Sequence, residues 1–142
     1  MREYHWRNNP PIAESEVDVP MVIQIKRIYD SYEKSDGIRL LVDRVWPRGV
    51  SKENAHLDGW VKELAPSSQL RIWFGHRAEN FEAFAALYQA ELDANAEAQS
   101  AARQLILQSK QNMVTLLYGA KNPQINHAVV LKTYLESEAL SV

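Results

Sequence analysis

The chain has 142 residues, of which 46% are hydrophobic and 24% are charged, and its formal net charge is −2. This length predicts a single domain with a proper core, and the near-neutral charge gives no support to bulk electrostatic binding of nucleic acid. The lack of cysteine excludes disulfides, thiolate nucleophiles and thiolate metal ligands. No stretch approaches the roughly 20 apolar residues of a membrane span, and the N-terminus lacks the apolar core of a secretory signal. We therefore expect a cytoplasmic protein.

Residues 1–20 differ in composition from the remainder of the chain. They hold three of the six prolines and show no apolar period. We interpret them as a flexible or loosely docked N-terminal extension. The predicted domain then spans residues 21–142.

Three segments have the pattern of β-strands. Val22–Ile28 alternates apolar and polar residues, whereas Ile38–Val42 and Met113–Tyr118 are nearly continuous apolar runs. Such runs are typical of strands that are covered on both faces. The link between the first two strands is only about nine residues, which is short for a parallel crossover, so the direction of the first strand stays open.

Five segments have helical spacing or helix-capping residues. Pro66 would end the first of them, and Ser67 and Gly75 would begin and end the second. The predicted helices are Leu57–Leu64, Ser67–Phe74, Glu79–Leu92, Glu97–Ser109 and Ile125–Glu138. A helical stretch of roughly 60 residues separates the two apolar strands, and we therefore predict an α/β fold. It would have a small, mostly parallel sheet with helices on both faces.

The segment Val42–Lys52 is the most informative part of the sequence. The second predicted strand ends in Asp43 and Arg44, and a Trp-Pro pair, Arg48 and a glycine follow. Guanidinium groups match the geometry of carboxylates and phosphates, and ligands of open α/β sheets bind at the carboxyl ends of strands. We therefore predict an anion site here.

Residues that follow the last predicted strand should lie near this segment. Arg44, Arg48 and Lys121 would converge on one crevice together with Asp43 and Tyr118. For Arg44 and Arg48 we favour ligand binding. For Asp43 we favour a structural ion pair with an arginine that pins the turn, and for Trp46-Pro47 we favour packing.

Two further clusters carry candidate residues. Arg71 and His76 lie at the end of the second predicted helix, where His76 could act as a general base, although a capping or solvent-facing role is favoured. Asn126 and His127 lie at the start of the last helix, where free amide groups attract anions. The alternative is that Asn126 caps the helix and His127 is packed.

Several classes of site find no support in the sequence. The four histidines, His5, His56, His76 and His127, are scattered, so we predict no metal site and no cofactor. There is no Gly-x-Ser-x-Gly motif for a serine nucleophile. Glycine-rich phosphate or dinucleotide loops are also absent.

A set of ordered motifs resembles a known family. They are Ile25-Lys-Arg-Ile-Tyr-Asp30, Asp36-Gly37, Leu41-Val-Asp-Arg-Val-Trp-Pro-Arg-Gly-Val-Ser-Lys52, Ala65-Pro-Ser67, Leu70-Arg71, Trp73-Phe-Gly-His76 and Asn126-His-Ala-Val-Val-Leu131. Together they resemble the DUF488 family, in its YeaO-like branch. The resemblance covers about residues 21–137 and implies a small cytoplasmic bacterial α/β protein, without an established reaction.

The resemblance also limits the chemistry. Other branches of the family carry Cys-His-Arg near the last helix, and the matching positions here are Asn126, His127 and Ala128. Thiol chemistry suggested for those branches cannot be transferred, because this chain has no sulfur at that position.

Three functions are compatible with the sequence. The favoured function is binding of a small anionic ligand that bears phosphate or carboxylate. The residues that would hold it are Arg44, Arg48, Arg71, Lys121, Tyr118 and Asn126. If catalysis occurs, His76 or His127 would be the acid or base, with Asp43 as its orienting group. The alternative is a non-catalytic interaction protein, oligomeric through exposed tryptophans. The third is a nucleic-acid module that stacks bases on Trp46 or Trp60, which the charge balance disfavours.

Overall fold

The computed structural model describes residues 20–139 of the chain, and the predicted extension therefore lies almost entirely outside the described residues. The strands are β1 (Ile23–Arg27), β2 (Ile38–Leu41), β3 (Gly59–Trp60) and β4 (Val114–Tyr118). The helices are α1 (Lys52–Ala55), α2 (Ser68–Phe74), α3 (Phe81–Ala94), α4 (Ala96–Ser109) and α5 (His127–Ala139). Short 3-10 turns lie at Lys34–Asp36, Lys62–Leu64 and Ala78–Asn80.

The four strands form one parallel sheet in the order β1-β4-β2-β3. This order settles the direction of β1, which is parallel to β4. The short β1–β2 link suffices because the chain returns along only a five-residue strand, roughly 17 Å, and crosses two strand spacings of about 4.8 Å. The ten residues between β1 and β2 span roughly 33 Å in extended form, which is long enough for this return.

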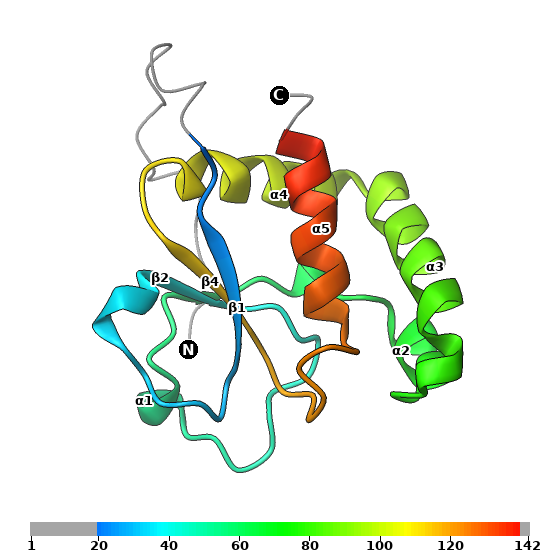
Figure 1. The fold of residues 1–142 in the computed structure, drawn as a ribbon, viewed down its shortest axis with the longest axis horizontal. Coiled ribbons are helices and arrows are strands. Elements are labelled where there is room, and N and C mark those ends of the chain that lie inside the picture. Colours follow the sequence, from blue (N-terminus) through cyan, green and yellow to red (C-terminus); the bar gives the residue numbers. More distant parts are fainter. Residues whose placement is uncertain (1–19, 140–142) are drawn as a thin grey trace.

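One face of the sheet is covered by long helices. In Figure 1, α3, α4 and α5 lie together on the same side of the strands. Leu40, Leu116 and Tyr118 point into this core, which also contains Phe84 of α3 and Leu131 of α5. The opposite face is covered by the single-turn helix α1 and the loops beside it. The predicted α/β fold is thus confirmed, although the second face has only a short helix.

One predicted helix is wrong. Instead of a helix, Leu57–Leu64 contains β3 and a 3-10 turn. Leu57 and Trp60 pack on the α1 side of the sheet, whereas Val61 and Leu64 belong to the core beneath the long helices. The helix-like spacing therefore arises because the chain crosses the edge of the sheet.

The caps of the other helices agree with the sequence. The Ser67 hydroxyl accepts a hydrogen bond from the Leu70 amide at 3.1 Å, and Gly75 ends α2 in the left-handed conformation. At α5, the Asn126 side chain accepts a hydrogen bond from the Val129 amide at 3.1 Å. The proposed capping role of Asn126 is confirmed.

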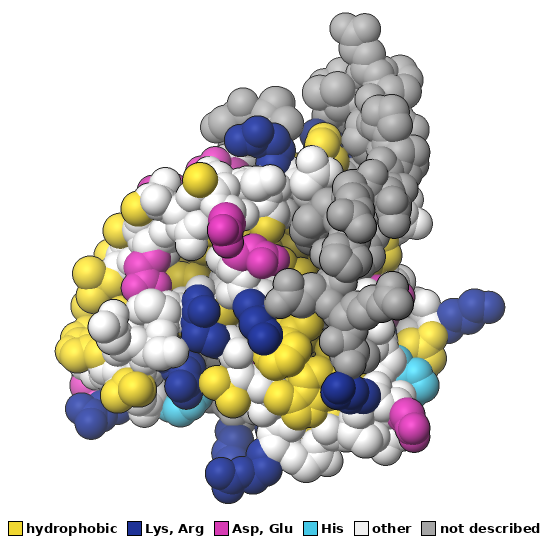
Figure 2. All heavy atoms as spheres, turned by 180° about the vertical axis from the view of Figure 1, so that it is seen from behind, with side chains coloured by type: hydrophobic (Ala, Val, Ile, Leu, Met, Phe, Trp, Pro, Cys, Tyr) yellow, Lys and Arg dark blue, Asp and Glu magenta, His cyan; other side chains and the backbone are white. Residues whose placement is uncertain are grey.

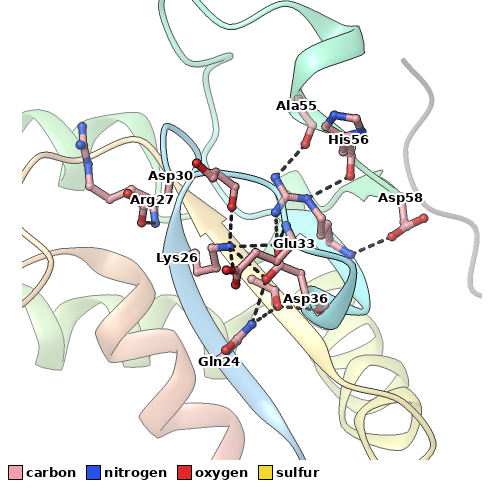
Figure 3. A network of polar contacts seen from close by, with 12 residues as sticks. Gln24, Lys26, Arg27, Asp30, Glu33, Asp36, Ala55, His56 and Asp58 are labelled. Carbon is pink, nitrogen blue, oxygen red and sulfur yellow. Dashed lines mark hydrogen bonds and ion pairs between the residues drawn. The ribbon is translucent and has the colours of Figure 1, made fainter.

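A buried ion-pair network fills the sheet face opposite the long helices (Figure 3). Asp36 has no solvent exposure, and its carboxylate contacts the Arg39 guanidinium and lies 3.0 Å from the Lys26 ammonium. It also accepts hydrogen bonds from the Glu33 amide at 3.1 Å and from Gln24 at 3.3 Å. Burial acts to raise the pKa of Asp36, but the hydrogen bonds from Lys26, Glu33 and Arg39 together lower it below its ordinary value.

Arg39 links this network to the segment around α1. Its Nε donates to the His56 carbonyl at 3.1 Å, and its Nη2 donates to the Ala55 carbonyl at 2.9 Å. Nη1 contacts Asp36. Each nitrogen of the guanidinium thus has an acceptor within the protein.

Candidate functional site

A cleft of about 690 Å³ lies where β2 and β4 end. Asp43 lines it just after β2, Gly119 just after β4, and His127 at the start of α5. The cationic side chains along it are Arg44, Arg48, Arg71 and Lys121. In Figure 2, Lys and Arg side chains gather around hydrophobic ones over the lower part of the molecule, the edge at which β1 and β4 end in Figure 1. The parallel strands thus bring these predicted residues into one cleft.

Asp43 and His127 form the polar centre of the cleft. The His127 Nε2 atom lies 3.0 Å from the Val42 carbonyl oxygen and 3.1 Å from Asp43 Oδ1. A carbonyl oxygen only accepts, so this contact requires the proton on Nε2. Oδ1 is buried and close enough for an ion pair with a protonated His127, yet it accepts no hydrogen bond. The structure therefore places His127 beside Asp43. Because no arginine within residues 20–139 pairs with Asp43, the predicted Asp43–arginine pair is wrong there.

Asp43 also fastens β2 to the end of β4. Its Oδ2 accepts a hydrogen bond from the Gly119 amide at 3.0 Å. A Cβ atom at position 119 would lie 3.0 Å from that same oxygen, so the close approach favours glycine. The expected pinning role of Asp43 holds, with a backbone amide as its partner.

Some of the hydrogen-bond donors of Arg44 are used by the protein itself. Its Nε donates to the Pro66 carbonyl at 2.9 Å and its Nη2 to the Ala65 carbonyl at 3.2 Å. This loop is in turn held by Glu91 of α3, which accepts from the Ser67 amide at 2.9 Å and the Ser67 hydroxyl at 2.5 Å. Arg44 therefore has a fixed guanidinium with fewer donors left for a ligand than the sequence suggested.

The other three cations are not engaged in this way. Arg48, Arg71 and Lys121 are exposed, and within residues 20–139 their side chains form no ion pair or hydrogen bond. The only carboxylate among the cleft-lining residues of the described chain is that of Asp43. The cleft therefore carries an excess of positive charge.

His76 also lines the cleft, on the side formed by α2. It follows Gly75, its own φ of 59° lies in the left-handed region, and its ring contacts Phe74 with centroids 6.0 Å apart. Its side chain is exposed. This exposure agrees with the favoured solvent-facing role, and the position beside the cleft leaves the general-base role a prediction.

Tyr118 is the one candidate that does not line the cleft. It is buried in the core under the long helices, because it shares the face of β4 with Leu116. Burial and the charge of Asp30 raise its pKa, against the opposing effects of Arg27 and Asn126. Asn126 lines the cleft, but its side chain caps α5 and donates to the Asn122 carbonyl at 2.8 Å.

Phe74 and Phe84 line the cleft, and Tyr88 lies next to its lining residue His127. Phe74 and Phe84 stack with ring centroids 4.2 Å apart, and Tyr88 contacts the edge of His127 at 6.3 Å. Burial and the charges of Asp43 and Glu91 raise the pKa of Tyr88 well above its ordinary value. Its hydroxyl therefore stays protonated and donates to the Leu64 carbonyl.

Tyr29 is a lining residue that the sequence reasoning missed. Its hydroxyl donates to the Arg48 carbonyl at 2.8 Å, and the Arg27 guanidinium lies over its ring at 4.8 Å. An aromatic residue just after the first strand would have been a signal had the direction of that strand been known.

The tryptophans differ in exposure. Trp46 donates to the Val50 carbonyl at 2.7 Å and meets the edge of Trp60 at 5.4 Å, so its packing role is confirmed, although it also lines the cleft. Trp73 of α2 is 46% exposed. Trp6 lies outside the described residues.

Residues 20–139 offer neither a metal site nor a membrane-spanning helix. No group of three or more His, Asp or Glu side chains there is arranged to hold a metal ion. None of the helices in that range is both long and apolar enough to cross a membrane.

Comparisons with known proteins identify the family. A family model described as "Inactive DUF488-N3 subclade" matches residues 22–141. "Uncharacterized protein YeaO" of Escherichia coli strain K12 is 45% identical over 117 residues, which cover 82% of this chain and 99% of that protein. "Uncharacterized protein Rv3073c" of Mycobacterium tuberculosis strain H37Rv is 35% identical over 113 residues, covering 80% and 92% respectively. No solved structure matches the chain. With these matches the resemblance is confirmed, and the chain belongs to the DUF488 family, in its YeaO-like branch.

Proposed function

We propose that this protein binds a small anionic ligand, bearing a phosphate or carboxylate group, in the cleft between the ends of β2 and β4. The observation that carries the proposal is the charge of the cleft. Arg48, Arg71 and Lys121 line it without a protein partner within residues 20–139. Arginine side chains bind planar anions in a bidentate manner, so an anion would relieve the mutual repulsion of these cations.

The surroundings of the cations support the same conclusion. The cleft lies at the carboxyl ends of parallel strands, where ligands of such sheets bind. It also lies at the amino end of α5, where the helix dipole favours negative charge. Arg44, fixed by the carbonyls of Ala65 and Pro66, adds a positive charge of defined position.

We favour binding over catalysis. The His127 Nε2 proton is directed at the Val42 carbonyl, and one oxygen of Asp43 is occupied by the Gly119 amide. Both groups thus hold the backbone of the cleft together. The family model that matches the chain is described as an inactive subclade, which is in keeping with this choice.

The test is a pair of calorimetric titrations, with inorganic phosphate and with acetate, at constant ionic strength. Arg48→Ala and Arg71→Ala should each weaken binding about tenfold, because a hydrogen bond to a charged group contributes about 1.5–3 kcal/mol. Arg103→Ala is the matched control, since Arg103 is an exposed arginine of α4 outside the cleft. No phosphate or carboxylate binding by the unmodified protein, or equal loss in the control, would refute the proposal.

A further inference from the structure

Resting on the proposed function, the shape and lining of the cleft lead us to a narrower ligand class. We infer that the cleft recognises an organic anion with a flat aromatic or heteroaromatic body, and that Tyr29 and Trp46 are the walls that select this body. The charged group of the ligand would meet the cations, and its ring would lie against these aromatic side chains.

The size of the cleft is the first reason. Its volume of about 690 Å³ lies in the range of small-molecule sites, roughly 300–1,000 Å³. A water molecule takes about 30 Å³ of liquid, so the cleft has room for some twenty such volumes. Inorganic phosphate or acetate would fill a small part of it and leave its apolar surface wet.

The lining of the cleft is the second reason. Away from the cations, the surface is formed mainly by apolar and aromatic side chains, among them Tyr29, Val45, Trp46, Pro47, Pro66 and Phe74. Pockets lined in this way, with a few convergent polar groups, are typical of sites for organic ligands. Because apolar surface gains free energy when it leaves water, a ligand with an apolar body binds here more tightly than its head group alone.

The fixed orientation of the two walls is the third reason. Tyr29 is held by its hydroxyl on the Arg48 carbonyl, and Trp46 by its indole nitrogen on the Val50 carbonyl. Both acceptors belong to the same loop, which also carries the Arg48 side chain. Tyr29 is still 45% exposed. The rings are therefore ordered before a ligand arrives, and little conformational freedom is lost on binding.

The experiment compares matched probes on the full chain. We expect phenyl phosphate to bind at least tenfold more tightly than methyl phosphate, or phenylacetate more tightly than acetate, because stacking on one aromatic side chain is typically worth tenfold or more. Whichever pair shows the larger gain identifies the head group as phosphate or carboxylate. Either result supports the inference.

Two variants assign the gain to the wall. Tyr29→Leu should remove a large part of the phenyl advantage. Tyr29→Phe keeps the ring and loses only the hydroxyl that orients it, so it should retain more of the advantage than Tyr29→Leu. Tyr32→Leu is the matched control, because Tyr32 is 47% exposed, similar to Tyr29, but does not line the cleft.

The outcomes separate the inference from the proposed function. If methyl and phenyl phosphate bind equally, and acetate and phenylacetate do so as well, the inference is wrong while anion binding stands. If none of the four probes nor inorganic phosphate binds, the proposed function itself fails. A phenyl advantage that survives Tyr29→Leu unchanged would overturn the role assigned to Tyr29.

Discussion

Two clusters of charged residues lie on this small sheet, and they are built in opposite ways. In the network on the α1 side, Asp36 and Arg39 are buried, and each nitrogen of the guanidinium meets a protein acceptor. In the cleft, Arg48 and Arg71 are exposed, and their side chains have no protein partner within residues 20–139. The same residue types therefore stabilise the fold in one place and remain open to a ligand in the other.

The difference lies in how completely the acceptors match the donors. Asp36 receives hydrogen bonds on both carboxylate oxygens, whereas Asp43 is bonded on Oδ2 only. Removing a partner from a closed, buried pair leaves an uncompensated charge, and removing an exposed cation does not. This contrast predicts different consequences for substitutions in the two clusters.

The largest expected effect is that of Arg39→Ala. It should lower the free energy of unfolding by about 3–5 kcal/mol, because Asp36 loses its closest partner and stays buried. Arg48→Ala, the matched change in the cleft, should alter stability by no more than about 0.5 kcal/mol. Denaturant unfolding measures both, and comparable losses in the two variants would contradict the contrast between the two clusters.

A smaller effect is expected in acid. Because the pKa of Asp36 is lower in the folded protein than its ordinary value of 3.8, its contribution is fully present above that value. The contribution is lost as the pH falls from about 3.8 through the folded-state pKa. The free energy of unfolding, measured along a pH series, should therefore fall less steeply in this window for Asp36→Asn than for the unmodified chain. A slope identical to that of the unmodified chain would contradict this role.

The smallest expected effect concerns the acid of the cleft. Asp43→Asn retains an oxygen that can accept from the Gly119 amide but removes the negative charge among the cations. Phosphate should then bind about threefold to tenfold more tightly, or ~1 kcal/mol, because a repulsive charge at close range is gone. Weaker binding in a calorimetric titration would instead mean that the Asp43 carboxylate contacts the ligand.

The fold followed from the sequence where local patterns determine structure. The apolar runs became β2 and β4, and Ser67 and Gly75 delimit α2 as expected. Leu57–Leu64 was mispredicted because residues spaced like a helix face pack on opposite sides of the sheet. That spacing becomes informative only when the edge of the sheet is known.

The site was predictable in its position and less so in its contacts. Parallel strands carry the residues that follow them to one edge, so Arg44, Arg48 and Lys121 line one cleft. Side-chain direction and backbone acceptors were not visible in the sequence. Arg44 binds carbonyls that are supplied by a loop some twenty residues later. The buried position of Asp36, within a segment that looks like a polar turn, was likewise hidden.

The contrast between the two clusters predicts that the cleft, and not the buried network, binds anions. An amide chemical-shift titration of the labelled full chain with phenyl phosphate tests it most directly, with methyl phosphate as the comparison and ionic strength held constant. We predict saturable shifts at Arg48, Gly119 and His127, which border the cleft, and none at Asp36 or Arg39. Shifts centred on Asp36 and Arg39, or no saturable shift at any amide of the cleft, would contradict the claim.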